Sequence, residues 1–308
     1  MTKVFIDGSA GTTGLRIHER LADRKDIELL VLPEELRKDT AARREALHTA
    51  DIAFLCLPDD VAREAVALAE GSNVAIIDTS TAHRTDSGWE YGFPELYGRR
   101  RKIAQSKRIG NPGCHASGFI ALVEPLMRAG MIKKNVNLSC VSLTGYSGGG
   151  KKMIAEYESA ERDTLLDAPR MYGLAQQHKH LKEMSRITGM DVPPIFCPIV
   201  APFYAGMEVT VPVHAKTLGA TIDEVGEVYK AYYKDGLVKF VENADEGGFL
   251  SANAFEGRDD MQISVFGNAE RYILVARYDN LGKGASGAAI QNMNLLLGVD
   301  EATGLVTE

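Results

Sequence analysis

The chain has 308 residues, 45% of them hydrophobic and 25% charged, which is the balance of a folded globular protein rather than of a disordered one. Its 35 lysines and arginines are outnumbered by 42 acids, so the sequence predicts neither a nucleic-acid partner nor an anionic membrane partner. No apolar run approaches the roughly 18 residues that span a bilayer, and the scattered cysteines have no CxxC spacing, so we expect a cytoplasmic protein without a metal site.

Short apolar runs alternate with helical stretches over the first third of the chain. These runs are Val4 to Ile6, Ile27 to Leu32, Ile52 to Leu57 and Val74 to Ile77. Such alternation is typical of a parallel sheet covered by helices. The sequence therefore predicts an α/β fold with a Rossmann-like dinucleotide-binding domain over residues 1–113.

The strand pattern changes after about residue 113. Apolar and polar residues alternate from Met207 to Ala215, which indicates a strand with one buried face. We therefore expect an α+β catalytic and dimerisation domain over residues 114–284, built on a mixed or antiparallel sheet. The apolar positions of the last helix, within residues 285–308, predict that this helix returns to complete the first domain.

A glycine-rich turn, GSAGTTG, follows the first strand. Its GxxGxxG spacing differs from the usual GxGxxG fingerprint, but its place between a strand and a helix is the one that a pyrophosphate-binding turn needs. A tight turn without a ligand is the alternative. The residues predicted here to bind the cofactor are Gly8, Ser9, Gly11, Thr12, Thr13 and Gly14.

The residues after the second strand decide between NAD and NADP in this kind of fold. Acidic Glu34 and Glu35 are followed here by basic Arg37 and Lys38, so the local signal is mixed. Arg84 follows the fourth strand, at the sheet edge where ligands bind, and is a candidate phosphate clamp.

Cys114 follows the turn Asn111-Pro112-Gly113 and opens an apolar helical run. A thiol at a helix N-terminus is stabilised as the thiolate, which is the form that attacks a carbonyl carbon. A small buried residue at a helix start is the alternative. The remaining cysteines lie in strand-like runs, where an inert buried thiol is expected, namely Cys56, Cys140 and Cys197.

A histidine pair, His178 and His180, is the candidate source of a general base, and Glu183 could orient it. Spacing does not choose between the two histidines, and a polar helix surface or a zinc site is the alternative.

Upstream, Ser147 and Gly148 begin a glycine-rich segment that could bind an anionic group of the substrate through backbone N–H groups. A flexible loop is the other interpretation of this segment.

Several motifs in combination resemble the N-acetyl-gamma-glutamyl-phosphate reductase family, in its shorter form. They are GSAGTTG, LCLPDD, DTSTAHR, YGFPEL, GNPGC, GYSGGGK, HKH followed by Glu183, and DNLGKGASGAAIQNMN. The resemblance spans nearly the whole chain, and the wider superfamily includes aspartate-semialdehyde dehydrogenase.

The resemblance implies an NADP-dependent oxidoreductase of arginine biosynthesis that reduces N-acetyl-L-glutamyl 5-phosphate through a thioester and forms a homodimer or homotetramer. It implies Cys114 as the nucleophile, with the histidine pair, Glu183 and Tyr172 around it. Further residues implied near the cofactor are Pro58, Ser80, Asn280, Lys283 and Gly284. Reduction of another acyl phosphate, such as aspartyl phosphate, and a non-catalytic NADP-binding protein are the alternatives.

Two segments depart from the family pattern. Many relatives have Tyr-Pro-Thr after the cysteine, where this chain has His115-Ala116-Ser117. They also have Thr-Pro-Glu-Ile near the histidines, where this chain has Leu181 to Met184, so the match of Glu183 depends on spacing.

Overall fold

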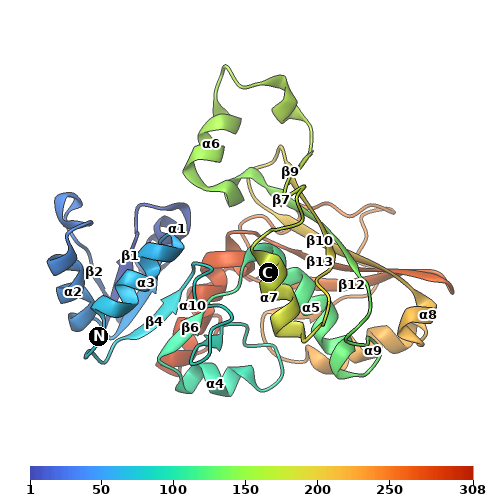
Figure 1. Ribbon diagram of the computed structural model, residues 1–308, viewed down its shortest axis with the longest axis horizontal. Helices are drawn as coiled ribbons and strands as arrows, with labels where there is room; N and C mark the ends of the chain where they lie inside the picture. Colours follow the sequence, from blue (N-terminus) through green and yellow to red (C-terminus); the bar gives the residue numbers. More distant parts are fainter. Residues whose placement is uncertain (308) are drawn as a thin grey trace. The chain divides into compact units, whose positions relative to one another are not determined.

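The computed structural model describes residues 1–307, which form two compact units (Figure 1). Unit 1 contains residues 1–94, 98–112 and 285–305. Unit 2 contains residues 95–97, 113–284 and the described residues from 306 on. Gly113, placed by the sequence in the first domain, belongs to unit 2 because it is the N-cap of the helix that starts at Cys114.

Unit 1 is built on a six-stranded sheet in the order β2-β1-β3-β4-β6-β5, and every pair of neighbouring strands in it is parallel. Its strands are β1 (Thr2–Asp7), β2 (Ile27–Leu30), β3 (Ile52–Leu55), β4 (Ala75–Asp78), β5 (Glu90–Tyr91) and β6 (Arg108–Gly110). Its helices are α1 (Thr12–Leu21), the 3-10 turn η1 (Glu34–Leu36), α2 (Thr40–Thr49), α3 (Asp59–Leu68), α4 (Arg99–Gln105) and α10 (Gly287–Leu297).

Both faces of this sheet are buried under helices. On one face Ile17 of α1, Ile103 of α4 and Met293 of α10 pack in a single apolar cluster with Val4 and Phe54 of the strands. The other face packs against α2 and α3. The continuous apolar character of these strands follows from this double coverage.

Unit 2 contains a seven-stranded sheet in the order β11-β12-β13-β10-β7-β9-β8. Its strands are β7 (Ser139–Gly145), β8 (Arg170–Met171), β9 (Ile195–Ala201), β10 (Met207–His214), β11 (Val238–Phe240), β12 (Met261–Gly267) and β13 (Arg271–Tyr278). Strands β11 and β12, and likewise β7 and β9, are parallel, and the other neighbours are antiparallel, so the sheet is mixed.

The helices of unit 2 are distributed along the chain between these strands. They are α5 (Cys114–Arg128), the 3-10 turn η2 (Tyr146–Gly149), α6 (Gly150–Glu158), the 3-10 turn η3 (Thr164–Asp167), α7 (His180–Thr188), α8 (Ala215–Leu218) and α9 (Ile222–Tyr232). A π-helical turn, η4 (Gly282–Ser286), precedes α10.

Helix α5 is the central helix of unit 2, and almost all of its residues are buried. A Cβ atom added at Gly118 would lie 2.6 Å from Cγ2 of Val209, so glycine is what allows α5 to lie this close to β10. Tyr229 of α9 donates a hydrogen bond to the carbonyl of Leu122 on the same helix. Helix α5 is therefore held between the sheet and α9.

The predicted fold class is confirmed, because a Rossmann-like parallel sheet and a second domain with a mixed sheet are both present. None of the helices within residues 1–307 is both long and apolar enough to span a membrane.

Candidate active site

The backbone conformation of the turn GSAGTTG in unit 1 requires glycine at two of its positions. Gly8 has a φ of +90°, and a Cβ atom there would lie 2.3 Å from the carbonyl oxygen of Cys56. A Cβ at Gly14 would lie 2.5 Å from the carbonyl oxygen of Gly8. Gly11 caps helix α1, whose first residues are Thr12 and Thr13. The backbone therefore approaches itself closely at a helix N-terminus, as anion-binding turns do.

A polar atom without a partner lies in this turn. The Thr12 hydroxyl oxygen is buried and has no hydrogen-bond partner among residues 1–307. A buried hydroxyl without a partner costs free energy, and a pyrophosphate oxygen would supply one. The turn therefore fits the phosphate end of a dinucleotide.

A cavity of about 610 Å³ in unit 1 adjoins this turn, and its volume suits the adenosine part of a dinucleotide. Gly8 and Ser9 line it from the turn, and Pro58 lines it from the end of β3. Its apolar wall is formed by Leu29, Leu30, Val31, Leu32, Leu57 and Val61.

The charged residues around this cavity indicate which cofactor, NAD or NADP, the segment after β2 favours. Arg37 and Lys38 line the cavity, whereas Glu34 and Glu35 do not. Within residues 1–307, neither Arg37 nor Lys38 forms an ion pair, and both are exposed. Two cations at the wall of a dinucleotide cavity would favour a 2′-phosphate over ribose hydroxyls.

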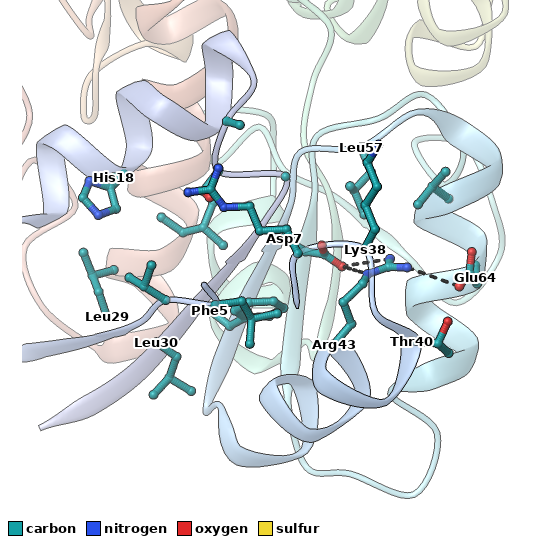
Figure 2. A pocket seen from close by; sticks show the side chains of 18 of the residues that line it. Phe5, Asp7, His18, Leu29, Leu30, Lys38, Thr40, Arg43, Leu57 and Glu64 are labelled. Atoms are coloured by element: carbon teal, nitrogen blue, oxygen red, sulfur yellow. Dashed lines mark hydrogen bonds and ion pairs between the residues drawn. The ribbon is translucent and has the colours of Figure 1, made fainter. Parts of the chain in front are cut away.

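An ion-pair network around the buried Arg43 side chain lies at the same cavity (Figure 2). The Arg43 guanidinium donates to Oδ2 of Asp7 at 3.0 Å and to Oε1 of Glu64 at 3.2 Å. Burial raises the pKa of Asp7, and Arg43 opposes that rise. Arg43 therefore neutralises the carboxylate nearest the glycine turn. Arg43 was not predicted from the sequence, because no local pattern links it to Asp7, 36 positions away.

Ser80 and Arg84 lie in the segment after β4 and are held by internal bonds. The Ser80 hydroxyl donates to Oδ2 of Asp78 at 2.7 Å, and His83 bonds to the same oxygen. Arg84 donates from Nε to the carbonyl of Asn111 at 2.8 Å and from Nη2 to that of Thr79. These bonds connect the ends of β4 and β6. The role of Arg84 as a phosphate clamp stays a prediction.

Cys114 is the first residue of α5, so its side chain lies at a helix N-terminus. Its carbonyl oxygen accepts a hydrogen bond from the Tyr278 hydroxyl at 2.5 Å. A Cβ atom added at Gly284 would lie 3.1 Å from Cβ of Cys114, so the turn before α10 packs directly against this residue. A side chain at position 284 would therefore crowd Cys114, which favours glycine there, and the predicted cofactor contact of Gly284 stays a prediction.

Cys56 and Cys140 have environments expected of inert thiols, whereas Cys197 is partly exposed and its predicted inertness stays a prediction. Burial raises the pKa of Cys140, and burial raises that of Cys56 to about 12. A thiol with so high a pKa carries little thiolate near neutral pH.

Glu183, from helix α7, is a buried carboxylate beside this helix terminus. Its Oε1 accepts the backbone N–H of Gly113 at 2.8 Å. Glu183 therefore holds the turn that presents Cys114, a contact that the sequence did not reveal. Its predicted role in orienting a histidine stays a prediction.

Three imidazole rings form a cluster that includes His115, the residue directly after Cys114 in the chain. The ring centroid of His115 lies 6.0 Å from that of His178 and 5.5 Å from that of His180, and the latter two are 4.8 Å apart. Phe196 packs against His115 and His178. The predicted histidine pair is thus brought to the first turn of α5. Within residues 1–307 there is no group of side chains suited to hold a metal ion.

The hydrogen bonding of His178 indicates its neutral form. Its Nδ1 accepts the backbone N–H of His180 at 3.3 Å, so in the neutral ring the proton is on Nε2. Burial and the neighbouring Lys179 lower the pKa of His178, while Glu183 opposes this effect. The ring is partly exposed, whereas His180 is buried.

Tyr172 reaches the same cluster from the segment after β8. Its hydroxyl is 2.7 Å from Nε2 of His115, whose Nδ1 is 2.7 Å from Oγ of Ser142 on β7. Neither His115 nor Ser142 was predicted from the sequence as a site residue. The sequence features that could have indicated them are the position of His115 directly after the predicted nucleophile Cys114 and the place of Ser142 on the buried face of β7.

The remaining predicted residues of unit 2 form a separate network. Nδ2 of Asn280 donates to Oγ of Ser147 at 3.0 Å, and its Oδ1 accepts the N–H of Gly206. A Cβ atom at Gly148 would lie 3.4 Å from Nδ2 of Asn280. The glycine-rich segment is the turn η2 followed by α6 rather than an open loop. Asn280 thus braces the residues predicted to bind substrate.

Lys283 lies in the turn before α10 and is almost completely buried. Its Nζ forms an ion pair with Glu95 at 2.8 Å, within unit 2. Removal of one member of such a buried ion pair destabilises the protein, because the other charge is left buried without a partner. The structure therefore gives Lys283 a structural contact, and its predicted cofactor contact stays a prediction.

Family models match both parts of the chain. A semialdehyde dehydrogenase NAD binding domain matches residues 32–106, and a semialdehyde dehydrogenase dimerisation domain matches residues 114–280.

Similar full-length proteins carry one name. The chain is 45% identical to N-acetyl-gamma-glutamyl-phosphate reductase 2 of Nostoc sp., over 98% of this chain and 99% of that protein. It is 45% identical to N-acetyl-gamma-glutamyl-phosphate reductase of Rhizobium etli, over 96% of this chain and 98% of the relative. The reductase of Burkholderia cenocepacia is 43% identical over 97% of this chain and 98% of its own length.

Solved structures share the fold. Aspartate semialdehyde dehydrogenase II of Vibrio cholerae superposes with a TM-score of 0.72 at 17% identity, covering 97% of this chain and 98% of that one. Aspartate semialdehyde dehydrogenase of Francisella tularensis gives 0.72 at 16% identity, with 96% and 100% covered.

The contact between Glu183 and Gly113 predicts the effect of two replacements on stability. Glu183→Gln keeps a side-chain acceptor for the Gly113 N–H, whereas Glu183→Leu leaves that buried group without one, at a cost of about 1–3 kcal/mol. We expect urea unfolding to show a clear loss of stability for Glu183→Leu and a smaller one for Glu183→Gln. Equal losses would show that the carboxylate charge, and not the bond to Gly113, is what stabilises this turn.

Proposed function

The chain belongs to the N-acetyl-gamma-glutamyl-phosphate reductase family, and from this membership we propose that it reduces N-acetyl-L-glutamyl 5-phosphate with NADPH. The products are N-acetyl-L-glutamate 5-semialdehyde and phosphate, in arginine biosynthesis. The observation that carries the proposal is the place of Cys114 at the start of α5, next to a histidine cluster.

Cys114 carries out the covalent step. Its thiolate attacks the acyl carbon, a carbon–sulfur bond forms, and the carbon–oxygen bond to phosphate breaks, which leaves a thioester. When bound, NADPH supplies the hydride that reduces this thioester, and collapse of the resulting thiohemiacetal releases the semialdehyde and restores the thiolate. The overall reaction takes up one proton, which leaves on the phosphate.

We assign the proton exchange at the reacting oxygen to His178. Its ring is partly exposed and can exchange protons with water, and the bond from His180 places the proton of the neutral ring on Nε2. Nε2 can therefore donate to the oxyanion of the thiohemiacetal and take the proton back as that intermediate collapses. His180 supports this role through its backbone N–H.

Unit 1 holds the cofactor in this proposal. The turn from Gly8 to Gly14 binds the pyrophosphate, and the apolar wall of the cavity receives the adenine. Arg37 and Lys38 bind the 2′-phosphate that distinguishes NADPH from NADH.

The match to a dimerisation domain supports an oligomer, which we propose to be a homodimer or homotetramer in the cytoplasm. One face of the sheet in unit 2 carries partly exposed apolar residues in adjacent strands, which suits contact with a second copy. Examples are Val141 and Leu143 on β7 and their neighbours Cys197 and Ile199 on β9.

The role of Cys114 is tested by Cys114→Ala. We expect the phosphate-dependent oxidation of N-acetyl-L-glutamate 5-semialdehyde to fall by about 1,000-fold or more, because no other group supplies the acyl acceptor. NADPH binding should be retained. Cys140→Ala, which replaces a strand-embedded thiol, is the control and should remain active. Activity of Cys114→Ala near the wild-type level would falsify the assignment. If the wild-type enzyme oxidised aspartate semialdehyde in preference, aspartyl phosphate would be the substrate instead.

The role of His178 predicts a pH dependence. In the oxidation direction the base must be neutral, so the rate falls as pH drops through the pKa of the base. Because burial lowers the pKa of His178 below 6.5, this acidic limb should lie below pH 6.5. His178→Asn should remove the limb and lower the rate by about 100-fold or more, whereas His180→Asn should keep the limb. The opposite pattern would move the assignment to His180.

The cofactor preference is tested by neutralising the two cations. Each of Arg37→Gln and Lys38→Gln should weaken NADPH binding about tenfold and leave NADH binding nearly unchanged, because only NADPH carries the 2′-phosphate. Glu35→Gln is the matched control, since Glu35 does not line the cavity. Equal weakening for both nucleotides in a fluorescence titration would refute this 2′-phosphate site.

A further inference from the structure

His115 is the residue directly after Cys114. It lies in the first turn of α5, and only 2% of its surface is exposed. Both ring nitrogens have hydrogen-bond partners, Ser142 at Nδ1 and Tyr172 at Nε2, each at 2.7 Å. The ring therefore joins β7 to the segment after β8.

The ring of His115 is neutral in the working range of pH. Burial, and then the charge of nearby His178, lower the pKa of His115 to about 3. A neutral imidazole has one N–H donor and one acceptor. Of Ser142 and Tyr172, one therefore donates to the ring and the other accepts from it.

The burial of Ser142 decides the direction of these bonds. Its side chain is completely buried, and within residues 1–307 its hydroxyl has no other hydrogen bond. If Nδ1 of His115 donated to Ser142, the serine proton would be buried without an acceptor, at a cost of about 1–3 kcal/mol. Ser142 therefore donates to Nδ1, the ring proton is on Nε2, and Nε2 donates to the Tyr172 oxygen.

This direction leaves the Tyr172 proton pointing away from His115. Within residues 1–307 the Tyr172 hydroxyl has no other hydrogen-bond partner. Burial and the charge of Cys114 raise the pKa of Tyr172, so the hydroxyl keeps its proton. The phenol lies near Cys114 in the fold, because its hydroxyl bonds the ring of His115, the residue directly after Cys114 in the first turn of α5. An O–H donor is thus held next to the place where the acyl phosphate reacts.

We propose that His115 is a positioning residue that, together with Ser142, holds the Tyr172 hydroxyl as a hydrogen-bond donor to an anionic oxygen of the substrate. The proposal rests on the proposed function, since it presumes an acyl phosphate bound at Cys114. Tyr172 touches the substrate, and His115 acts through Tyr172. A donor held in one direction loses less conformational freedom on binding than a freely rotating hydroxyl.

Three replacements of His115 and Tyr172 separate this role from others. His115→Asn places its amide near the Nδ1 position and loses the bond to Tyr172, whereas His115→Gln places an amide N–H near Nε2 and keeps it. Tyr172→Phe removes the donor itself. The measurement is kcat and KM for phosphate-dependent oxidation of N-acetyl-L-glutamate 5-semialdehyde, from pH 5.5 to 9.

We expect His115→Asn and Tyr172→Phe each to lower kcat/KM about tenfold, mainly through KM. The double variant should lose the same factor rather than the product of the two, because both changes remove one donor. His115→Gln should restore most of the loss. A rise in KM for phosphate would identify a phosphate oxygen as the acceptor, and a rise in KM for the semialdehyde would identify an oxygen of the acyl part.

Other results would overturn the proposal. Multiplicative losses in the double variant, or a His115→Gln variant as poor as His115→Asn, would show that His115 does not act through Tyr172. A shift of the acidic limb in His115→Asn would make His115 a proton-transfer group instead. Unfolding temperature and the alkylation rate of Cys114 report whether a variant folds. A wild-type chain without activity would refute the proposed function, a result distinct from any of these.

Discussion

The N-terminal turn of α5 is the constraint on which the site in unit 2 depends. Glu183 binds the N–H of Gly113, Tyr278 binds the carbonyl of Cys114, and Gly284 packs against the Cys114 side chain. These contacts come from α7, from β13 and from the turn before α10. For the nucleophile that we propose Cys114 to be, a position held from three directions is the preorganisation that covalent catalysis needs.

The second feature of this site is that its buried titratable side chains are neutral. His115 and His178 both have lowered pKa values because of burial, and Tyr172 has a raised one. All three side chains are therefore neutral near neutral pH, and their hydrogen bonds have defined directions. Neutral donors of this kind can stabilise a developing oxyanion without first binding a counter-ion.

The cofactor cavity of unit 1 depends on electrostatics of a different kind. Arg43 pairs with Asp7 inside the protein and with Glu64, whose side chain is 48% exposed. Arg37 and Lys38 remain uncompensated at the cavity wall. The net effect is a positive ribose end in a chain whose overall charge is −7.

Local patterns in the sequence were sufficient for the fold class, the glycine turn and the place of Cys114 before an apolar helix, because each is encoded within a few neighbouring residues. Only the tertiary structure decided which side chains meet. Glu183 and Gly113 are 70 positions apart, and His115 and Tyr172 are 57 apart. The same holds for Arg37 and Lys38, since their place on the cavity wall depends on how the segment after β2 folds. No periodicity or spacing encodes such pairs, because packing between separate elements brings them together.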